Sequence, residues 1–394
     1  MISVKKALSS VLNNFNWEKA KEMPLLDSLG HVLGKDIFAP DKLPRFDNSA
    51  MDGCVIRSQD TKRGKRVLLK IVSSIFSGDD INGLLIKRRE TAQIATGAPI
   101  PKGTNAVVAM ENANVKDGFI EIDKKISKGT NIRKAGEDVK VGKIVARHGD
   151  LITPGLIGFL SSLGITSVKV FAPPEVGLIA TGSELACAYG RIGKFQIRDS
   201  NTSSLVALLK SAGINPVFVK RFPDKKNTLC KFLKNLKTHS NIIILAGGVS
   251  VGEHDYVKQE LEKFGVKRLF WKVSQKPGKP LYAAIRNGTI FFGLPGNPAA
   301  VITCFYLYVL PVINKCMHKL SIHLPKTFAI LENDVKTDEC RTVFLRARYK
   351  NGRVKLLKGQ GSHMLLSFSK ANSLFMANPG KHYKKGKKVQ IFLL

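Results

Sequence analysis

The stretch from Asn241 to Tyr256 reads NIIILAGGVSVGEHDY, an apolar run that ends in glycines and then delivers acidic side chains. A short Ile/Leu run is typical of a buried parallel strand, and open α/β sheets bind ligands beyond the carboxyl ends of such strands. Glycine backbone N–H groups can approach an anion there, and a carboxylate such as that of Asp255 can hold a hard cation. The stretch predicts an α/β domain with a phosphate-and-metal pocket, although many glycine turns only reverse the chain.

The same texture continues on both sides of this stretch, from 173 to 323. The strand-like runs are EVGLIAT, NPVFVK, NIIILA and TIFFGL, and between them lie the helical patterns NTSSLVALLKSAG, TLCKFLKNLK, DYVKQELEKFG and AAVITCFYLYVLPVINK. Alternating strands and helices predict βαβ units and a doubly wound, largely parallel sheet. A segment of about 150 residues is long enough to be a domain by itself.

The N-terminal part has a helical texture in two separate places. Residues 1–38 show helical spacing of apolar positions and then LLDSLGHVLGKDI, which predicts a second helix that stops near Gly34. Residues 143–172 contain ITPGLIGFLSSLGI, with Pro154 near a helix start and Gly164 near its end. Helices are therefore expected on both sides of the segment that separates them.

The remaining segments look like β structure. Residues 39–142 consist of short β-like runs cut by Gly, Pro and Asn, which predicts a small β-rich domain. Residues 324–394 contain TVFLRARYK, RVKLLK and KKVQIFLL between turn residues, which predicts a small barrel or sandwich. The expected fold class is a multidomain α/β plus β protein.

Length and composition limit the classes of protein. A chain of 394 residues exceeds one ordinary core, so two to four domains are expected. We expect no uninterrupted apolar run to approach the ~20 residues of a bilayer span. The N-terminus, MISVKKALSSVLNNFNWEKAKEM, mixes charges into its apolar positions and lacks the continuous core of a signal peptide. A cytoplasmic protein without a membrane segment is the expectation.

The cysteines and the net charge favour no special class by themselves. The six cysteines form no CxxC pair, which argues against a zinc ribbon or a disulfide framework and predicts reduced, mostly structural thiols. The formal net charge is +33, which is typical of a nucleic-acid-binding protein or of a lysine-rich background composition. Background composition is favoured, because the lysines are spread along the chain without a nucleic-acid-binding motif. Either interpretation favours small anionic ligands.

Three loops of small and polar residues follow apolar strands in the α/β segment. They are LIATGSELA at 178–186, the opening loop, and FFGLPGNPAAV at 291–301. Because the strand ends of one sheet converge on one crevice, Glu184, Asp255 and the Gly296–Asn297 backbone could share a ligand. The last loop can also be a turn with Pro298 at the first helical position, which is compatible with a site because helix N-termini attract phosphate.

Other loops add cations and carboxylates. WKVSQKPGKPL at 271–281 places three lysines around a Pro-Gly turn, which suits a phosphoanhydride and equally suits a lysine-rich surface turn. The loops at 44–56, 94–108 and 133–145 are rich in Asp, Asn and Gly, which by itself indicates plain turns.

Seven motifs taken together carry a resemblance to a known family. FDNSAMDG, ATGAPIPKGTNAVV, AGEDV, TGSEL, GGVSVGEHDY, KPGKP and GLPGNP occur in this order. They resemble the MoeA family of molybdopterin molybdenumtransferases, which includes the gephyrin E domain and the plant Cnx E domain, and the match covers nearly the whole chain. Cys54 stands where the family commonly has a tyrosine, which we interpret as a packing change.

The resemblance implies an activity and its residues. The family converts adenylylated molybdopterin and molybdate into molybdenum cofactor and releases AMP, assisted by a divalent metal such as Mg²⁺. Asp255 and Glu184 would hold the metal. The other residues implied for catalysis are Lys272, Lys276, Asp52, Thr96 and Asp138. Those implied for binding substrate or molybdate are Lys279, Pro280, Gly247, Gly248, Ser250, Gly296, Asn297, Asp224, Arg346 and Ser362. An Arg fork, a hydroxyl and backbone N–H groups suit a tetrahedral dianion, molybdate or tungstate alike.

The resemblance also implies partners and a domain division. The protein would be a homodimer in which domain II, 39–142, faces the crevice of the partner subunit. Residues 1–38 and 143–172 would form one discontinuous domain, 173–323 the MogA-like α/β domain III, and 324–394 the barrel-like domain IV. An upstream MogA-like adenylyltransferase and downstream molybdoenzyme chaperones are possible partners.

Two other function classes stay open from the sequence. The gephyrin E domain also binds receptor peptides, so a scaffold or peptide-binding module is one alternative. The chain begins at Met1 with its E-like portion, so a dedicated enzyme is favoured over a scaffold. Nucleic-acid binding is the weaker alternative, since only the net charge supports it.

Overall fold

The computed structural model describes residues 1–61, 66–186, 191–236, 239–249, 256–337 and 340–394. The described chain forms two compact units. The larger consists of Met1–Glu22, Gly30–Gly34 and Lys169–Leu394, and the smaller of Met23–Leu29 and Lys35–Val168. Each unit is described by itself below.

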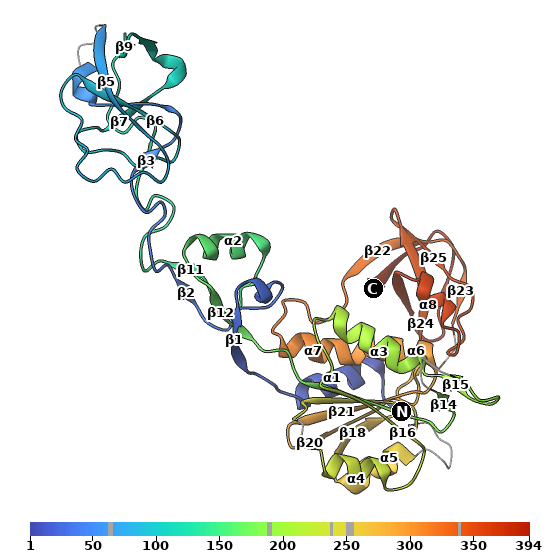
Figure 1. The fold of residues 1–394 in the computed structure, drawn as a ribbon. Helices are drawn as coiled ribbons and strands as arrows, with labels where there is room; N and C mark the ends of the chain where they lie inside the picture. Colours follow the sequence, from blue (N-terminus) through green and yellow to red (C-terminus); the bar gives the residue numbers. More distant parts are fainter. Residues whose placement is uncertain (62–65, 187–190, 237–238, 250–255, 338–339) are drawn as a thin grey trace. The chain divides into compact units, whose positions relative to one another are not determined.

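A six-stranded sheet forms the centre of the larger unit, in the order β16-β13-β17-β21-β20-β18 (Figure 1). The strands are β13 (Val176–Thr181), β16 (Phe218–Phe222), β17 (Ile242–Ala246), β18 (Lys267–Trp271), β20 (Tyr282–Arg286) and β21 (Thr289–Leu294). The first four in spatial order run parallel, and β20 and β18 add an antiparallel edge. All five residues of β17 are buried, as expected for a strand covered on both faces. The predicted doubly wound, largely parallel sheet is confirmed.

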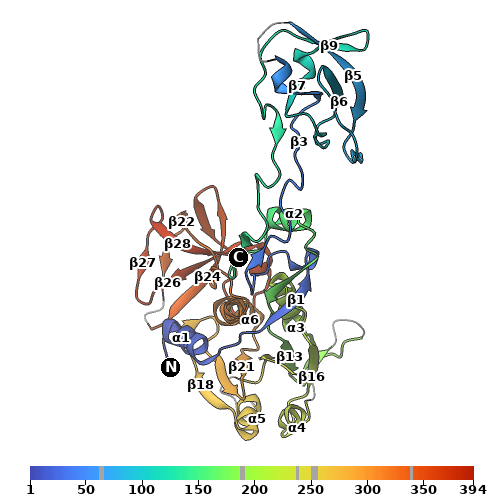
Figure 2. The ribbon, with the colours of Figure 1, turned by 90° about the vertical axis from the view of Figure 1, so that its left-hand side faces the viewer.

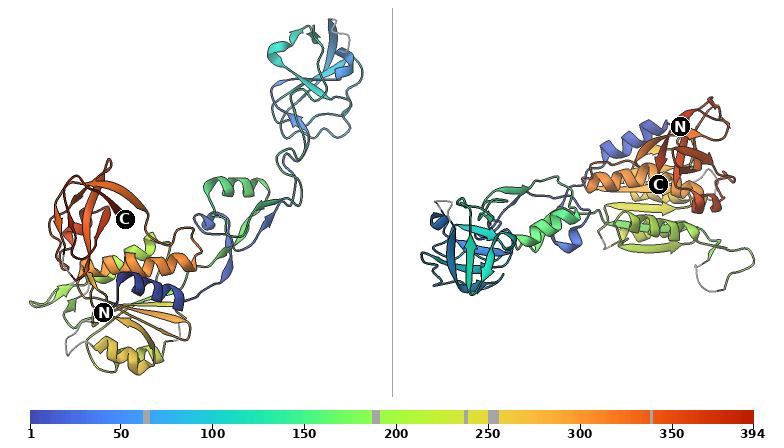
Figure 3. Two further views of the ribbon diagram at one scale, coloured as in Figure 1. Left: turned by 180° about the vertical axis from the view of Figure 1, so that it is seen from behind. Right: turned by 90° about the horizontal axis from the view of Figure 1, so that it is seen from above.

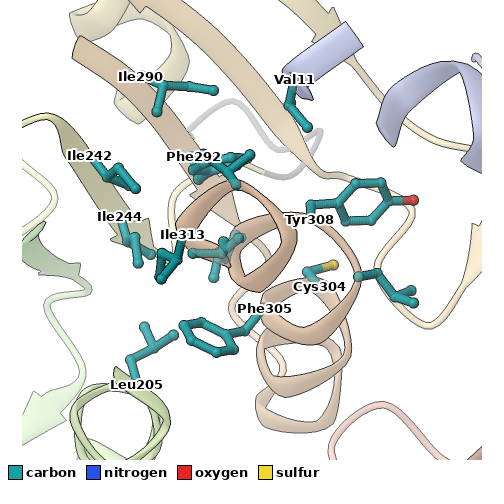
Figure 4. Packing of buried hydrophobic residues seen from close by; sticks show 14 of the residues in the cluster. Val11, Leu205, Ile242, Ile244, Ile290, Phe292, Cys304, Phe305, Tyr308 and Ile313 are labelled. Carbon is teal, nitrogen blue, oxygen red and sulfur yellow. The ribbon is translucent and has the colours of Figure 1, made fainter. Parts of the chain in front are cut away.

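Helices cover both faces of this sheet. One face packs against α1 (Val4–Asn14), α3 (Ser200–Ser211) and a continuous helix made of α6 (Pro298–Cys304), the π-helical η4 (Phe305–Val309) and α7 (Leu310–Cys316). The other face packs against α4 (Thr228–Lys234) and α5 (Tyr256–Phe264). Figure 4 shows the first core, where Leu205 lies beside Phe305 of the continuous helix and Ile244 lies beside Ile313. The helices on the two faces bury the sheet, so that the carboxyl ends of its parallel strands lie at one fixed edge.

The continuous helix corrects one expectation from the sequence. Pro298–Cys316 is a 19-residue helix that is long and apolar enough, by length and composition, to cross a membrane. The expectation that no apolar run approaches this length was therefore wrong. However, 83% of its apolar window is buried inside the protein, because the helix packs on the sheet through side chains such as Val309 and Val312. It is a core helix of the α/β domain.

The N-terminal segment matches the predicted helices only in part. Helix α1 forms as predicted, with Ser3 as its N-cap. The second predicted helix was wrong, since only a single turn, η1 (Leu26–Ser28), is helical, between β1 (Ala20–Pro24) and the bridge at Leu33. The N–H of Gly34 donates to the carbonyl of Lys169 at 2.8 Å, so this stretch is held by pairing with another strand rather than by helical bonds.

The C-terminal segment forms a small closed barrel within the larger unit (Figure 2). Five strands close it in the cyclic order β24-β25-β22-β28-β26, and β19 (Gln275–Lys276) joins at β24. The barrel strands are β22 (Lys326–Leu331), β24 (Thr342–Lys350), β25 (Arg353–Leu356), β26 (Ser373–Ala377) and β28 (Lys388–Leu393), with β23 (Val335–Lys336), β27 (His382–Tyr383) and helix α8 (Leu366–Lys370) around them. The predicted barrel is confirmed.

Four further strands form two small ribbons. In the larger unit, β14 (Leu185–Ala186) pairs parallel with β15 (Ile197–Arg198). The chain passes between the two units through the ribbon of β1 and β12 (Ser167–Phe171).

The smaller unit is built on its own β sheet, drawn in blue and teal in Figure 3. The sheet has six strands in the order β7-β4-β6-β5-β9-β8. The strands are β4 (Gly53–Ile56), β5 (Val67–Ile75), β6 (Glu90–Ile94), β7 (Ala106–Ala109), β8 (Asn114–Lys116) and β9 (Phe119–Ile122). Short pairs and turns complete it, namely β2 (Ile37–Phe38) with β11 (Ile144–Ala146), β3 (Asn48–Ser49) with β10 (Ile132–Arg133), η2 (Ser58–Thr61) and η3 (Met110–Asn112). Helix α2 (Pro154–Ser162) begins and ends as predicted, with Thr153 as its N-cap. The predicted β-rich segment is confirmed.

Candidate functional site

A crevice of about 720 Å³ opens where the parallel strands of the α/β sheet end. Its walls come from the segments that follow β13, β17 and β21 and from the start of α3. This is the edge at which open α/β sheets bind ligands. Six of the residues predicted from sequence line it: Glu184, Asp224, Gly247, Gly248, Gly296 and Asn297.

The glycine loop after β17 reaches the crevice because it has no side chains. Gly247 and Gly248 have φ angles of 97° and 64°, in the left-handed region that favours glycine. A Cβ on Gly247 would lie 2.5 Å from the carbonyl oxygen of Thr181, and one on Gly248 would lie 2.5 Å from Cγ2 of Val257. The backbone of this loop therefore packs tightly against β13 and α5.

The start of α3 forms a second wall. Asp199 is buried and caps the helix, accepting from the N–H of Thr202 at 3.0 Å and from its hydroxyl at 2.6 Å. Arg221 lies 3.3 Å from the same carboxylate, and its charge offsets the cost of burying an ionised group. Asp199 is thus fixed in position at the crevice wall.

Two buried polar atoms at this wall lack a partner among the described residues. The side chain of Asn201 donates from Nδ2 to the carbonyl of Gly296 at 2.7 Å, which ties α3 to the loop after β21. Its Oδ1 and the Oγ1 of Thr181 have no hydrogen-bond partner in the described part of the chain. Since an unpaired buried polar group costs stability, these atoms are suited to a ligand or water in the crevice.

Glu184 and Asp224 contribute carboxylates to the lining of the crevice. Glu184 is exposed at the crevice and Asp224 is half-buried there, with its N–H donating to the hydroxyl of Ser183 at 3.1 Å. Within the described residues, no cluster of three or more His, Cys, Asp or Glu side chains is arranged to hold a metal. Mg²⁺ is commonly bound through one or two carboxylates plus substrate phosphates and waters, so Glu184 and Asp224 fit that ion. Asp255, predicted as the second metal ligand, lies outside the described residues, as does Ser250.

A loop of the barrel meets the start of α6. The Oγ of Ser362 accepts from Nδ2 of Asn297 at 3.0 Å, and its carbonyl accepts from the N–H of Ala299 at 3.0 Å. His363, the next residue, lines the crevice. The structure therefore brings Ser362, through a loop of the barrel, next to Asn297, which lines the crevice.

Arg346 holds this barrel loop from inside. Its side chain is 0% exposed, and Nη2 donates to the carbonyls of Gly359 at 2.8 Å and Gly361 at 3.1 Å. Nε and Nη1 have no partner among the described residues. Burial lowers the pKa of Arg346 to about 10. The side chain shapes the loop that carries Ser362, and Arg346 is not among the residues that line the crevice.

The predicted lysines lie outside the lining of the crevice. Lys276 and Lys279 are exposed on a turn that is closed by a hydrogen bond from the N–H of Val273 to the carbonyl of Lys279 at 2.9 Å, and Pro280 follows it. The Nζ of Lys272 lies 4.0 Å from the ring centre of Trp271. The turn contacts Cys304, which lies six residues after Pro298 and thus about 9 Å along the helix from the crevice.

The other predicted residues belong to the smaller unit. Oδ1 of Asp52 accepts from the N–H of Thr96 at 2.7 Å and from its hydroxyl at 3.0 Å. These bonds, the backbone one first, lower the pKa of Asp52 below its ordinary value of 3.8. Asp52 also lines a pocket of about 220 Å³. Asp138 is exposed and is not among the residues that line this pocket.

Sequence reasoning missed several residues of the crevice. Arg198, Asp199, Ser200 and Asn201 line it from one short segment, and His363 lines it from the barrel. A signal existed for Asp199, since RDSNTSS places an Asp just before a helical pattern, which is an N-cap signature. His363 had none, because its place depends on how the barrel packs.

Fold and crevice define the class of the larger unit as an α/β ligand-binding domain, and family models agree with that class. Residues 177–315 match the model described as a probable molybdopterin binding domain. Residues 2–164 match the MoeA N-terminal region, domains I and II, and residues 329–394 match the MoeA C-terminal region, domain IV. The chain belongs to the MoeA family.

Curated relatives and solved structures match over the whole length. Proteins named molybdopterin molybdenumtransferase from Staphylococcus epidermidis and Staphylococcus aureus are each 33% identical over 100% of this chain and 95% of their own length. A crystal structure of a molybdopterin biosynthesis MoeA protein from Pyrococcus horikoshii has 27% identity and a TM-score of 0.85, covering 100% of this chain and 99% of its own. The resemblance inferred from seven motifs is thereby confirmed.

Proposed function

We propose that this protein is a molybdopterin molybdenumtransferase, which inserts molybdate into adenylylated molybdopterin and releases AMP. The observation that carries the proposal is the crevice at the sheet edge, lined by a glycine loop and carboxylates, in a chain that matches enzymes of that name from end to end. It is therefore a transferase of molybdenum cofactor biosynthesis.

The glycine loop and the start of α3 would bind the phosphate end of the substrate. Gly248 is half-buried at the crevice without a side chain in the way, whereas the N–H of Gly247 already donates to the carbonyl of Leu294 at 3.1 Å. Helix α3, which has 12 residues, directs its N-terminus to the same crevice. Oδ1 of Asn201 and Oγ1 of Thr181 would gain partners from the bound molecule.

Carboxylates at the crevice would hold the divalent metal. Glu184, Asp224 and, from the resemblance, Asp255 are the residues assigned to Mg²⁺. When bound, Mg²⁺ would neutralise charge on the phosphoanhydride. The protein itself would orient the anhydride between the glycine loop and α3. Lys272 and Lys276, which the resemblance assigns to catalysis, are not among the residues that line the crevice.

Molybdate would bind between the KPGKP turn and the barrel. Lys279, Pro280, Arg346 and Ser362 are the residues assigned to it. The turn and the barrel are directly joined, because β19 pairs with β24, the strand that carries Arg346. Ser362 accepts a hydrogen bond from Asn297, the residue that precedes the first turn of α6.

The smaller unit is assigned to a homodimeric active site. Asp52, Thr96 and Asp138 would act in the crevice of the partner subunit, since the family resemblance gives this unit that role. The four-domain division, the cytoplasmic location and a MogA-like upstream partner belong to the same proposal. The close Asp52–Thr96 pair supports a defined role for these side chains.

The test is incubation of the purified protein with adenylylated molybdopterin, Mg²⁺ and molybdate, followed for AMP and for active cofactor. AMP release that depends on molybdate supports the transferase. A stoichiometric peptide partner without molybdate-dependent AMP release would favour a scaffold instead. Steeply salt-dependent DNA binding without AMP release would favour a nucleic-acid-binding protein.

A further inference from the structure

We propose that Gln275 and Tyr308 are positioning residues that fix the KPGKP turn in the shape needed to bind the oxyanion substrate. The inference rests on the proposed function, in which this turn contributes to molybdate binding. Neither residue was identified from the sequence. Both side chains are 0% exposed and lie in or beside the largest hydrophobic core, where an unpaired polar group would be costly.

The two side chains form a chain of hydrogen bonds that ends on the turn. The hydroxyl of Tyr308 donates to Oε1 of Gln275, and Nε2 of Gln275 donates to the carbonyl of Pro277 at 3.0 Å. Nε2 also lies 3.6 Å from Sγ of Cys304. Both ends of the Gln275 amide are therefore engaged, and its orientation is set by the donor on one side and the acceptor on the other.

The turn fits closely on this network. Gly278 has a φ of 92°, in the left-handed region, and an added Cβ would lie 2.5 Å from Sγ of Cys304 and 2.7 Å from Nε2 of Gln275. Cys304 and Tyr308 are four residues apart and so project from the same side of the helix (Figure 4). The core helix thus supports the turn through two side chains.

The network is electrically neutral. Burial raises the pKa of Tyr308 above its ordinary value, and burial likewise raises the pKa of Cys304. The phenol therefore stays protonated and can serve as the donor at neutral pH. The thiol likewise stays neutral, so neither group places a negative charge beside the turn that would repel an anion.

Gln275 also connects the turn to the barrel. Strand β19 pairs in parallel with β24, with Gln275 opposite Thr342 and Lys276 opposite Val343. A tilt of the turn would therefore shift Lys276 relative to Arg346, four residues beyond Thr342 on the same strand. For this reason we expect the network to affect binding of the small oxyanion more than binding of the pterin nucleotide.

The experiment compares Tyr308→Phe and Gln275→Leu with Thr303→Val as a matched control. Thr303 is also 0% exposed on the same helix, and its hydroxyl donates to the carbonyl of Ala299 at 2.7 Å, away from the turn. We expect the KM for molybdate to rise about five- to tenfold in the two test variants, the change expected when one neutral hydrogen bond is lost. The KM for adenylylated molybdopterin and the KM values of Thr303→Val should stay near those of the wild type.

Hydrogen exchange of the peptide 273–281 provides a second readout that needs no activity. Faster exchange in Tyr308→Phe than in Thr303→Val, at matched thermal stability, supports the inference. Equal exchange, or a molybdate KM that changes equally in all three variants, overturns it. If the wild type releases no AMP with molybdate while exchange still responds to Tyr308→Phe, the proposed function fails and the support of the turn by Gln275 and Tyr308 stands.

Discussion

Asp199 shows how one side chain contributes to both the stability and the chemistry of the crevice. It caps α3, pairs with Arg221 and lines the ligand space, although the functional motifs of the sequence do not include it. Replacing a capping Asp by Ala typically costs about 1 kcal/mol of stability. If a substitution of Asp199 lowered activity, the loss could come from weakening α3 or from changing the crevice. Glu184 is the better residue to test, because its exposed side chain is not needed to hold a helix in place.

Glu184→Gln should lower turnover about tenfold or more without lowering thermal stability, because an exposed carboxylate assigned to the metal becomes neutral at nearly constant shape. The measurement is the rate of AMP release at saturating Mg²⁺. Glu262→Gln is the control, since it makes the same change in an exposed ion pair with Arg268 at 3.5 Å. Equal rates for the two variants would remove Glu184 from the site.

Thr96→Val should raise the pKa of Asp52 toward its ordinary value of 3.8. The shift should be partial, because the bond from the N–H of Thr96 remains. Because the pKa of the Asp52 carboxylate is lower in the folded state than in the unfolded state, its hydrogen bonds with Thr96 stabilise the fold above pH 3.8. This stabilisation is lost as the pH falls through the folded-state pKa of Asp52. An NMR titration of the Asp52 carboxyl carbon measures this. Thr104→Val, whose hydroxyl donates to Pro101 instead, should leave the pKa unchanged.

Individual site residues could be predicted from the sequence where a motif surrounds them. Glu184, the Gly247–Gly248 loop and Gly296–Asn297 all follow predicted strands, and they share one crevice because parallel strand ends meet at one edge. Arg346 and His363 could not be placed, since their environments depend on how a barrel loop packs against a helix start. Gln275 gave no signal because a lone Gln is most often an exposed residue.

At the scale of secondary-structure elements, the crevice depends on tight contacts between strand ends and loops. The glycine loop after β17 packs on the end of β13, and Asn201 ties α3 to the loop after β21. These contacts leave little room for added atoms, so they are sensitive to small substitutions.

Gly247→Ala should destabilise the protein and abolish activity, because the new Cβ would lie 2.5 Å from the carbonyl oxygen of Thr181. Gly213→Ala separates this clash from backbone strain, since Gly213 has a similar φ of 83° with nothing within 4 Å of its Cβ position. Strain alone costs roughly 1–2 kcal/mol. Thermal unfolding and AMP release measure both effects. A loss in Gly213→Ala as large as in Gly247→Ala would contradict the close-packing argument.

Element prediction succeeded where apolar periodicity was strong and failed where pairing with distant segments decided the structure. The parallel strands and α2 formed as predicted. The antiparallel strands β18 and β20 flank the 271–281 stretch that was interpreted as a lysine-rich turn, and this edge of the sheet forms because β20 pairs with β21 and β18 pairs with β20. The second N-terminal helix failed because Gly34 and its neighbours bond to β12 instead.

At the scale of the whole molecule, the central question is whether one chain contains a complete site. The residues that line the crevice, which are assigned here to the substrate, belong to the larger unit, whereas Asp52 and Thr96 belong to the smaller one. The proposed homodimer would combine the two sets across subunits.

Mixing the impaired Glu184→Gln and Asp52→Asn variants, with subunit exchange, should raise activity to about a quarter of the wild-type value if the site is shared, because half of the dimers are mixed and each has one intact site. Each variant alone should keep its own low rate, and a mixture of either variant with itself is the control. Absence of recovery despite verified exchange would place all required residues in one chain.

The most direct test of the central claim is the amount of AMP released from adenylylated molybdopterin in a single turnover, with and without molybdate, in the presence of Mg²⁺. The transferase assignment predicts AMP and active molybdenum cofactor in equal amounts when molybdate is present. It also predicts that Glu184→Gln slows both products together, since the crevice is the site of the reaction. AMP release without cofactor formation, or no AMP release at all, would contradict the account.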